Sequence, residues 1–170
     1  AERAGVNKRM IYAHFGNKEQ LYVTVLTMVY NRIAEAEEIL LESELPVTDM
    51  VRRIIAMYFD FLAATPTFVR MLMWENLNNA ESLSAEEVRK LKAPTLDYIS
   101  SQIKRGKAEH VFKEEIDEYQ IIVSLMNFGF SYFSNIHTLS AILGKDMTDS
   151  AEVLKRADFV SNMILEYLVI

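Results

Sequence analysis

Residues 1–21 read AERAGVNKRMIYAHFGNKEQL, and this stretch decides the fold. Gly5 follows the pattern of a last helical turn, at a point where a residue with positive φ can reverse the chain. Asn7 is a suitable N-cap for a short second helix, from which Ile11 and Phe15 are spaced to pack inward. A helix, a tight glycine turn and a short basic and aromatic helix together predict a helix-turn-helix.

The start of the next helix carries a cation in an unusual place. Asn17 and Gln20 have the spacing of a capping box, which puts Lys18 in the first turn. A cation there opposes the helix dipole and is unfavourable unless an anion binds. Free backbone N–H groups, the dipole and the ammonium group would then converge on that anion, for which a DNA phosphate is the natural candidate.

The run Ala-Gly-Val-x-x-x-x-Ile-Tyr-x-His-Phe-x-Asn-Lys-Glu-x-Leu, from Ala4 to Leu21, resembles the signature that ends the DNA-binding domain of TetR/AcrR transcriptional regulators. This resemblance implies that the helix after the turn lies in the major groove of DNA. Family members have one complete helix and most of a second before the position of Ala1, so we expect the intact head to include them. The resemblance also implies DNA contacts, to base edges or nearby phosphates from Lys8, Arg9 and Met10, and to backbone phosphates from Tyr12, His14 and Lys18. Asn7 belongs to the same expected DNA-binding set.

The composition agrees with an all-helical protein. Hydrophobic residues make up 51% of the 170 residues, and only five glycines and three prolines interrupt them. The absence of cysteine excludes disulfides and thiolate nucleophiles and suits a reducing cytoplasm. The net charge of -6 argues against nucleic acid at first sight, but residues 1–20 hold four basic and two acidic side chains. A basic DNA-binding head on an acidic body would have this asymmetry.

Capping residues and apolar positions three or four apart predict six further helices, beginning at Lys18, at Thr48 or Asp49, and at Thr65-Pro66, Ser84, Glu114 and Asp149. The first would run to Glu42, the fourth would kink at Pro94 and end at Gly106, and the fifth would end at Leu143. We therefore expect an all-α fold with the end of a helix-turn-helix domain in 1–17, a connecting helix in 18–44, and a helical-bundle ligand-binding and dimerisation domain in 45–170.

The helix predicted for 114–143 indicates how the chain pairs. The run from Tyr119 to Gly144 has no charged side chain, yet it holds too many polar groups for a lipid-facing span, so no membrane partner is expected. Small polar residues follow one stripe and large apolar residues cover most of the rest, which favours a homodimer over a monomer with a partly exposed polar strip. The expected interface comprises Ser124, Asn127, Ser131 and Ser134 on this helix and Val160, Ile164 and Tyr167 on the last one.

Methionine and aromatic side chains of the helical body are core residues first, but such flexible, polarizable groups also line adaptable apolar pockets. We expect a pocket for a small apolar or amphipathic effector among Phe61, Met71, Trp74 and Phe128, with Glu75 and Asn127 as polar anchors. Carboxylates that lie near helix starts or on exposed faces are ordinary, and this interpretation covers the pairs Glu37-Glu38, Glu86-Glu87 and Glu114-Glu115.

These observations favour a cytoplasmic, ligand-responsive DNA-binding regulator. Its simplest form is a repressor that leaves a pseudo-palindromic operator in double-stranded DNA when an effector binds. No cofactor or metal is expected, because the three histidines lack metal-ligand spacing and cysteine is absent. The alternative is a helical ligand-binding or dimerisation module without DNA function. An enzyme is disfavoured, since we find no nucleophile-base-orienter set and no glycine-rich phosphate loop.

Overall fold

The computed structural model describes residues 5–41, 44–82 and 84–170, and within these ranges the chain forms helices without a strand. The predicted all-α fold is confirmed. In chain order the helices are α1 (Lys8–Phe15), α2 (Lys18–Leu41), α3 (Val47–Ala64), α4 (Pro66–Leu77), α5 (Ala85–Ala108), α6 (Glu118–Ser134), α7 (Ile136–Leu143) and α8 (Ser150–Leu168).

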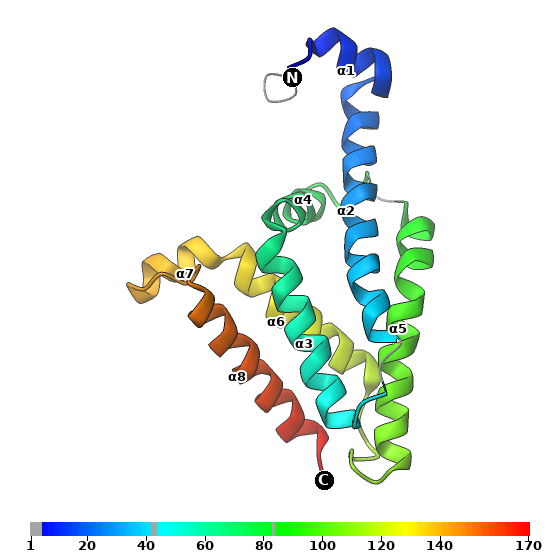
Figure 1. Cartoon of the computed structure of the whole chain (residues 1–170), viewed down its shortest axis with the longest axis vertical. Coiled ribbons are helices and arrows are strands. Elements are labelled where there is room, and N and C mark those ends of the chain that lie inside the picture. The colour runs from blue at the N-terminus through cyan, green and yellow to red at the C-terminus, as the bar shows by residue number, and fades with distance from the viewer. Residues whose placement is uncertain (1–4, 42–43, 83) are drawn as a thin grey trace.

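The long helix α2 connects the two parts of the molecule. Figure 1 shows α1 at one end, with α2 running from it into the body, where it lies beside α5. The 24 residues of α2 make a rod of about 36 Å at 1.5 Å per residue. Helix α2 covers Lys18–Leu41 of the helix that the sequence predicted to run to Glu42, and Glu42 lies outside the described residues.

Two apolar clusters hold the body together. The larger cluster joins α3, α5, α6 and α8, and its least accessible side chains are Met50, Phe59, Phe112, Val160 and Leu168. The second cluster attaches α2 to α3 and α4, through buried residues that include Leu26, Ile33, Leu62 and Phe68. The connecting helix is therefore packed against the body along its own apolar face, as the three-four spacing predicts.

In the described ranges, no helix taken singly has both the length and the apolar character to cross a membrane. The pair α3 and α4 passes that test of length and composition only when taken together, and the two helices are bent by 90°. Both contribute buried side chains to the clusters of the body.

The helix predicted for 114–143 is two helices, separated at Asn135. The Asn135 side-chain amide donates to the Ser131 carbonyl at 2.9 Å, so it competes for an acceptor at the end of α6. The chain then restarts as α7, which Gly144 ends in the left-handed conformation at φ 61°. Seven helices therefore follow α1 in the described chain, where the sequence predicted six.

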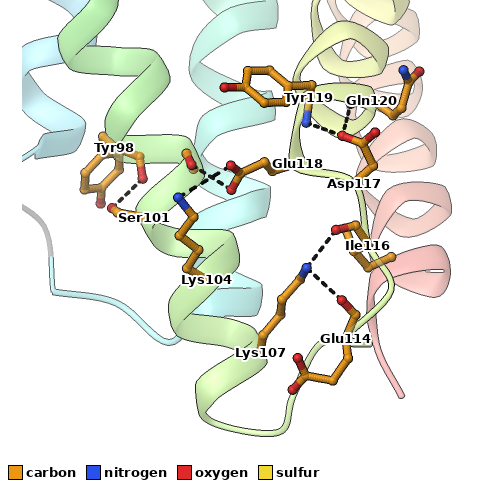
Figure 2. A network of polar contacts seen from close by, with 11 residues as sticks. Tyr98, Ser101, Lys104, Lys107, Glu114, Ile116, Asp117, Glu118, Tyr119 and Gln120 are labelled. Carbon is orange, nitrogen blue, oxygen red and sulfur yellow. Dashed lines mark hydrogen bonds and ion pairs between the residues drawn. The ribbon is translucent and has the colours of Figure 1, made fainter.

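A lysine of α5 holds the segment before α6, and this explains why that helix starts later than predicted. Lys107 Nζ lies 2.8 Å from the Glu114 carbonyl oxygen and 2.7 Å from that of Ile116. Figure 2 shows this side chain reaching from α5 to the connecting segment. Because these carbonyls accept hydrogen bonds from a lysine of another helix, they are not part of the hydrogen bonding of α6. Helix α6 begins after Asp117, whose carboxylate accepts the N–H groups of Tyr119 and Gln120.

Helix α5 passes without interruption through both positions where the sequence predicted a break. It contains Pro94 and continues beyond Gly106 to Ala108. Gly106 is buried, and a Cβ at this position would lie 2.1 Å from Cδ2 of Phe112. This glycine therefore permits the close approach of an aromatic ring and does not end the helix.

Candidate functional site

The predicted recognition helix presents its side chains to solvent. Gly5 has φ +62°, and the Asn7 side chain accepts the Arg9 backbone N–H at 2.9 Å, so both predicted turn and cap residues have the expected geometry. The residues predicted to contact DNA from this helix are all exposed, with Met10 61% and Tyr12 44% accessible. Because its side-chain oxygen already caps α1, Asn7 is less available to DNA than the other residues of the predicted set.

Lys18 has the position that the electrostatic argument requires. Asn17 and Gln20 form the reciprocal capping box, with the Gln20 N–H 2.8 Å from Asn17 Oδ1 and the Asn17 N–H 3.2 Å from Gln20 Oε1. Lys18 is exposed in the first turn of α2, next to Glu19. The predicted anion site is thus an exposed helix N-terminus with one ammonium and one carboxylate side chain.

Gly16 fixes the angle between α1 and α2, and sequence reasoning missed it. Its φ is +83°, and its N–H donates to the Tyr12 carbonyl at 2.8 Å to end α1. A Cβ at Gly16 would lie 1.8 Å from Oε1 of Gln20, the atom that caps α2. One helix therefore ends and the next begins within two residues, and the signal was the glycine directly before the capping asparagine.

A cavity of about 650 Å³ lies in the body, beside α2. Its walls come from α2, α3, α4, α5 and α6 and are mostly apolar, with Ile33, Ile54, Phe59, Leu72, Leu96 and Met126 among the lining residues. This volume is in the range that small-molecule sites in proteins occupy. No group of acidic or histidine residues within the described chain could hold a metal ion.

One wall of the cavity carries a buried ion pair between α2 and α5. Lys92 Nζ lies 2.5 Å from Glu37 Oε1, and the Thr95 hydroxyl donates to Glu37 Oε2 at 2.7 Å. Glu37 is only 5% exposed, so its interpretation as an ordinary surface carboxylate is corrected. The Tyr58 side chain lines the same cavity, where burial first and the Glu37 carboxylate second raise the pKa of its hydroxyl.

The six residues predicted to form the ligand site do not line this cavity. Phe61 is buried against Phe68 in the second apolar cluster, Trp74 is 57% exposed, and Asn127 is exposed on α6. Met71 and Phe128 are half-buried and pack against the apolar clusters. Met57 packs against the larger apolar cluster and also lies in the cavity wall.

Glu75 is fully buried at the contact between α4 and α2. Neither carboxylate oxygen receives a hydrogen bond of ordinary length from the described residues, although the Tyr22 hydroxyl lies near them. Burial and this neighbouring carboxyl group raise the pKa of Tyr22. Glu75 therefore lies beside the part of α2 that is nearest to the DNA-binding head. The sequence predicted it as a polar anchor of the ligand pocket, but it does not line the cavity.

The comparisons with known proteins identify both parts of the chain. The family model described as "Bacterial regulatory proteins, tetR family" matches residues 1–25, and the one described as "Tetracyclin repressor-like, C-terminal domain" matches residues 46–164. The chain belongs to the TetR family. It is a DNA-binding transcriptional regulator, as the resemblance of residues 4–21 implied.

Relatives and solved structures of other TetR-family proteins cover most of this one. The HTH-type transcriptional repressor NicS of Pseudomonas putida is 31% identical over 166 residues, which are 95% of this chain and 77% of NicS. A TetR regulator structure from Chloroflexus aurantiacus has a TM-score of 0.66 at 16% identity and covers 94% of this chain and 78% of its own. SCO0520 from Streptomyces coelicolor has a TM-score of 0.56 at 15% identity, covering 99% and 84%.

The residues predicted for the dimer interface of this TetR-family regulator are divided between its surface and its core. Asn127 and Ser131 are exposed on α6, Ser124 and Ser134 are half-buried, and Tyr167 is 57% exposed on α8. Val160 and Ile164 are 0% and 5% exposed within the subunit itself, because α8 packs this face against α3. These two side chains are thus unavailable to a partner.

Replacing Gly16 with alanine should weaken DNA binding while leaving the body folded. A sparsely populated backbone conformation with positive φ costs an alanine about 1–3 kcal/mol, and the added Cβ would displace the capping side chain of Gln20. We expect a roughly tenfold loss of duplex affinity in fluorescence anisotropy, with the melting temperature of the body little changed. Gly144→Ala is the control, because Gly144 has a similar φ of +61° but open space around it, far from the head. Equal DNA affinity of the Gly16 variant and the wild type would contradict this role.

Proposed function

We propose that this TetR-family regulator is a homodimeric, ligand-responsive repressor that leaves a pseudo-palindromic operator when a small apolar or amphipathic molecule fills the cavity beside α2. The observation that carries the proposal is that the same helix, α2, adjoins the recognition helix and lines the cavity. α2 begins directly behind the recognition helix, and its far half forms a wall of the cavity. A ligand that prefers one position of α2 would therefore shift the population of DNA-competent heads.

The head would read DNA through exposed side chains of α1 and the anion site at the start of α2. Lys8, Arg9 and Met10 supply base-edge or phosphate contacts, and Tyr12, His14 and Lys18 supply phosphate contacts in this proposal. Two such heads in a dimer would place their helices in successive major grooves, about 34 to 36 Å apart. A change in the direction of α2 would alter that spacing.

The partner would cover the outer face of α6 and α8. On α6 this face combines the exposed small polar residues with the exposed apolar side chains Tyr119, Val123 and Met126. On α8 it includes Phe159, which is 58% exposed and packs on Arg156 at 5.5 Å, and Tyr167. Apolar side chains in this amount on neighbouring helices favour a protein partner over solvent. The relative NicS carries the name repressor, which supports the sign of regulation proposed.

The function as a whole is tested by asking whether one compound acts at both ends of α2. In a screen of apolar and amphipathic compounds, any that raises the melting temperature should also release duplex DNA taken from the region around the protein's own gene. Val88→Phe would place a larger side chain in the cavity wall. The Val88→Phe protein should bind DNA with the affinity of the wild type, but the compound should no longer release it. Compounds that stabilise the body but leave DNA bound would refute ligand release.

The phosphate role of Lys18 is tested by salt dependence. Lys18→Ala should weaken binding to all duplexes by a similar factor and lower the slope of log affinity against log salt by about one. Lys90→Ala is the matched control, since it removes the same charge from an exposed position of α5. A loss confined to one base position would assign Lys18 to base reading instead.

The dimer is tested by placing a charge on its proposed face. Phe159→Asp should give the mass of one subunit in light scattering at micromolar concentration, because a buried, unpaired carboxylate strongly disfavours the interface. Ile142→Asp is the control, because Ile142 is 78% exposed on α7, outside this face. A wild-type protein with the mass of one subunit would overturn the dimer. A Phe159→Asp variant that keeps the mass of two subunits would show that the interface lies on another face.

A further inference from the structure

We propose that the effector is an amphipathic carboxylic acid whose anionic head takes the place of Glu37 on Lys92, and so releases α2 from α5. The inference rests on the proposed function and names both the chemical class of the ligand and the contact that it switches. Three observations carry it: the apolar lining of the cavity, the charges in its wall, and the helix to which Glu37 belongs.

The lining requires that most of the ligand be apolar. Residues of α3 and α6 on this wall are hydrocarbon, aromatic or thioether side chains, among them Ile54, Met57, Ile122 and Leu125. Burying such a surface is favourable at about 25 cal/mol per Å². A fully polar ligand would leave it exposed, so a hydrocarbon or aromatic skeleton fits the cavity best.

The charges in the wall select an anionic head group. Two cations of α5, Arg89 and Lys92, line the cavity one helical turn apart, whereas Glu37 is the one carboxylate among the described residues of the lining. Arg89 has no ion-pair partner among the residues that the structure describes. An acid would find both cations, while an amine would have to displace Lys92 and then face two positive charges.

The surrounding groups agree with an anion. The cavity reaches the first turn of α5 at Ala85 and Val88, where the helix dipole is positive. Glu86 and Glu87 of the same turn do not line this cavity. Thr95 and Tyr58 both line this cavity, and each carries a hydroxyl that can donate a hydrogen bond to a carboxylate.

Displacing Glu37 forces α2 to move. Its bonds to Lys92 and Thr95 are the side-chain hydrogen bonds that join α2 to α5 within the described ranges. A carboxylate that loses these partners while still buried is strongly unfavourable, and it must reach water. Glu37 lies near the end of α2, so this end would have to turn outward, and the rigid helix would carry the change to the head.

Matched probes separate the charge of the ligand from its apolar part. Phenylbutyric acid, phenylbutanol and phenylbutylamine share one skeleton and differ in the head group. In the intact wild-type protein the acid should raise the melting temperature most and release DNA, while the amine should do neither. If no probe binds, the cavity is not an effector site, and both the proposed function and this inference fail. If the alcohol or the amine binds best, the proposed function stands and this inference fails.

Variants of the ion pair test the exchange itself. Glu37→Gln keeps the shape but leaves Lys92 available, so the acid should bind roughly tenfold more tightly and DNA should bind more weakly without ligand. Arg89→Met should weaken the acid several-fold, because it removes one of the two cations that line the cavity. Glu86→Gln is the control for Glu37→Gln, because it also removes one carboxylate, from an exposed position of α5.

The double variant Glu37→Gln with Lys92→Met avoids a buried unpaired charge and should lose the preference for the acid. The inference is overturned if Glu37→Gln leaves acid affinity unchanged or lowers it. A preference for the acid in the double variant would equally overturn it. A fall in melting temperature alone, without a change in ligand preference, would assign the ion pair to stability only.

Discussion

The rest of the structure depends on the continuity of α2 between two polar contacts of different kinds. At its start, the reciprocal bonds of Asn17 and Gln20 and the left-handed Gly16 fix its direction relative to α1. Toward its end, Glu37 ties it to α5 at the cavity wall. Between these points an apolar face packs on α3 and α4. A rigid helix with polar contacts at both ends transmits a displacement that separate short helices would absorb.

The elements that local chemistry determines could be predicted from the sequence. Asn7, Asn17 and Ser84 lie at predicted helix starts, and each side chain accepts a backbone N–H from two or three residues later. Asn135 shows the limit of this reasoning, because its side chain competes with the backbone while the flanking apolar pattern continues across the break. Gly106 shows another limit, since the ring of Phe112 that makes it necessary belongs to a later segment.

The cavity wall depends on contacts between residues that are far apart in the sequence, and a local sequence pattern does not predict such contacts. Lys8 and Arg9 could be assigned because a helix-turn-helix exposes fixed positions. Glu37 could not, although it lies four residues after Ile33 on the inward face of α2, because a carboxylate at such a position is normally solvated. Its partners on α5 are 55 and 58 residues away in sequence. The sequence did contain one indication of this pair. In each of the two helices, a charged residue stands at a position where the helical spacing calls for an apolar side chain.

The two buried carboxylates of the body differ in what they can do. Glu75 is fully inaccessible and lies outside the cavity, so exchanging its environment requires separating α4 from α2. Glu37 borders the cavity, and its partners are a cation and a hydroxyl that an incoming carboxylate can bind equally well. Because ion pairs in such places contribute little net stability, one anion can replace another at small free-energy cost. The same exchange at Glu75 would expose apolar core, and this difference is why we propose the cavity wall, and not Glu75, as the place where a ligand acts on α2.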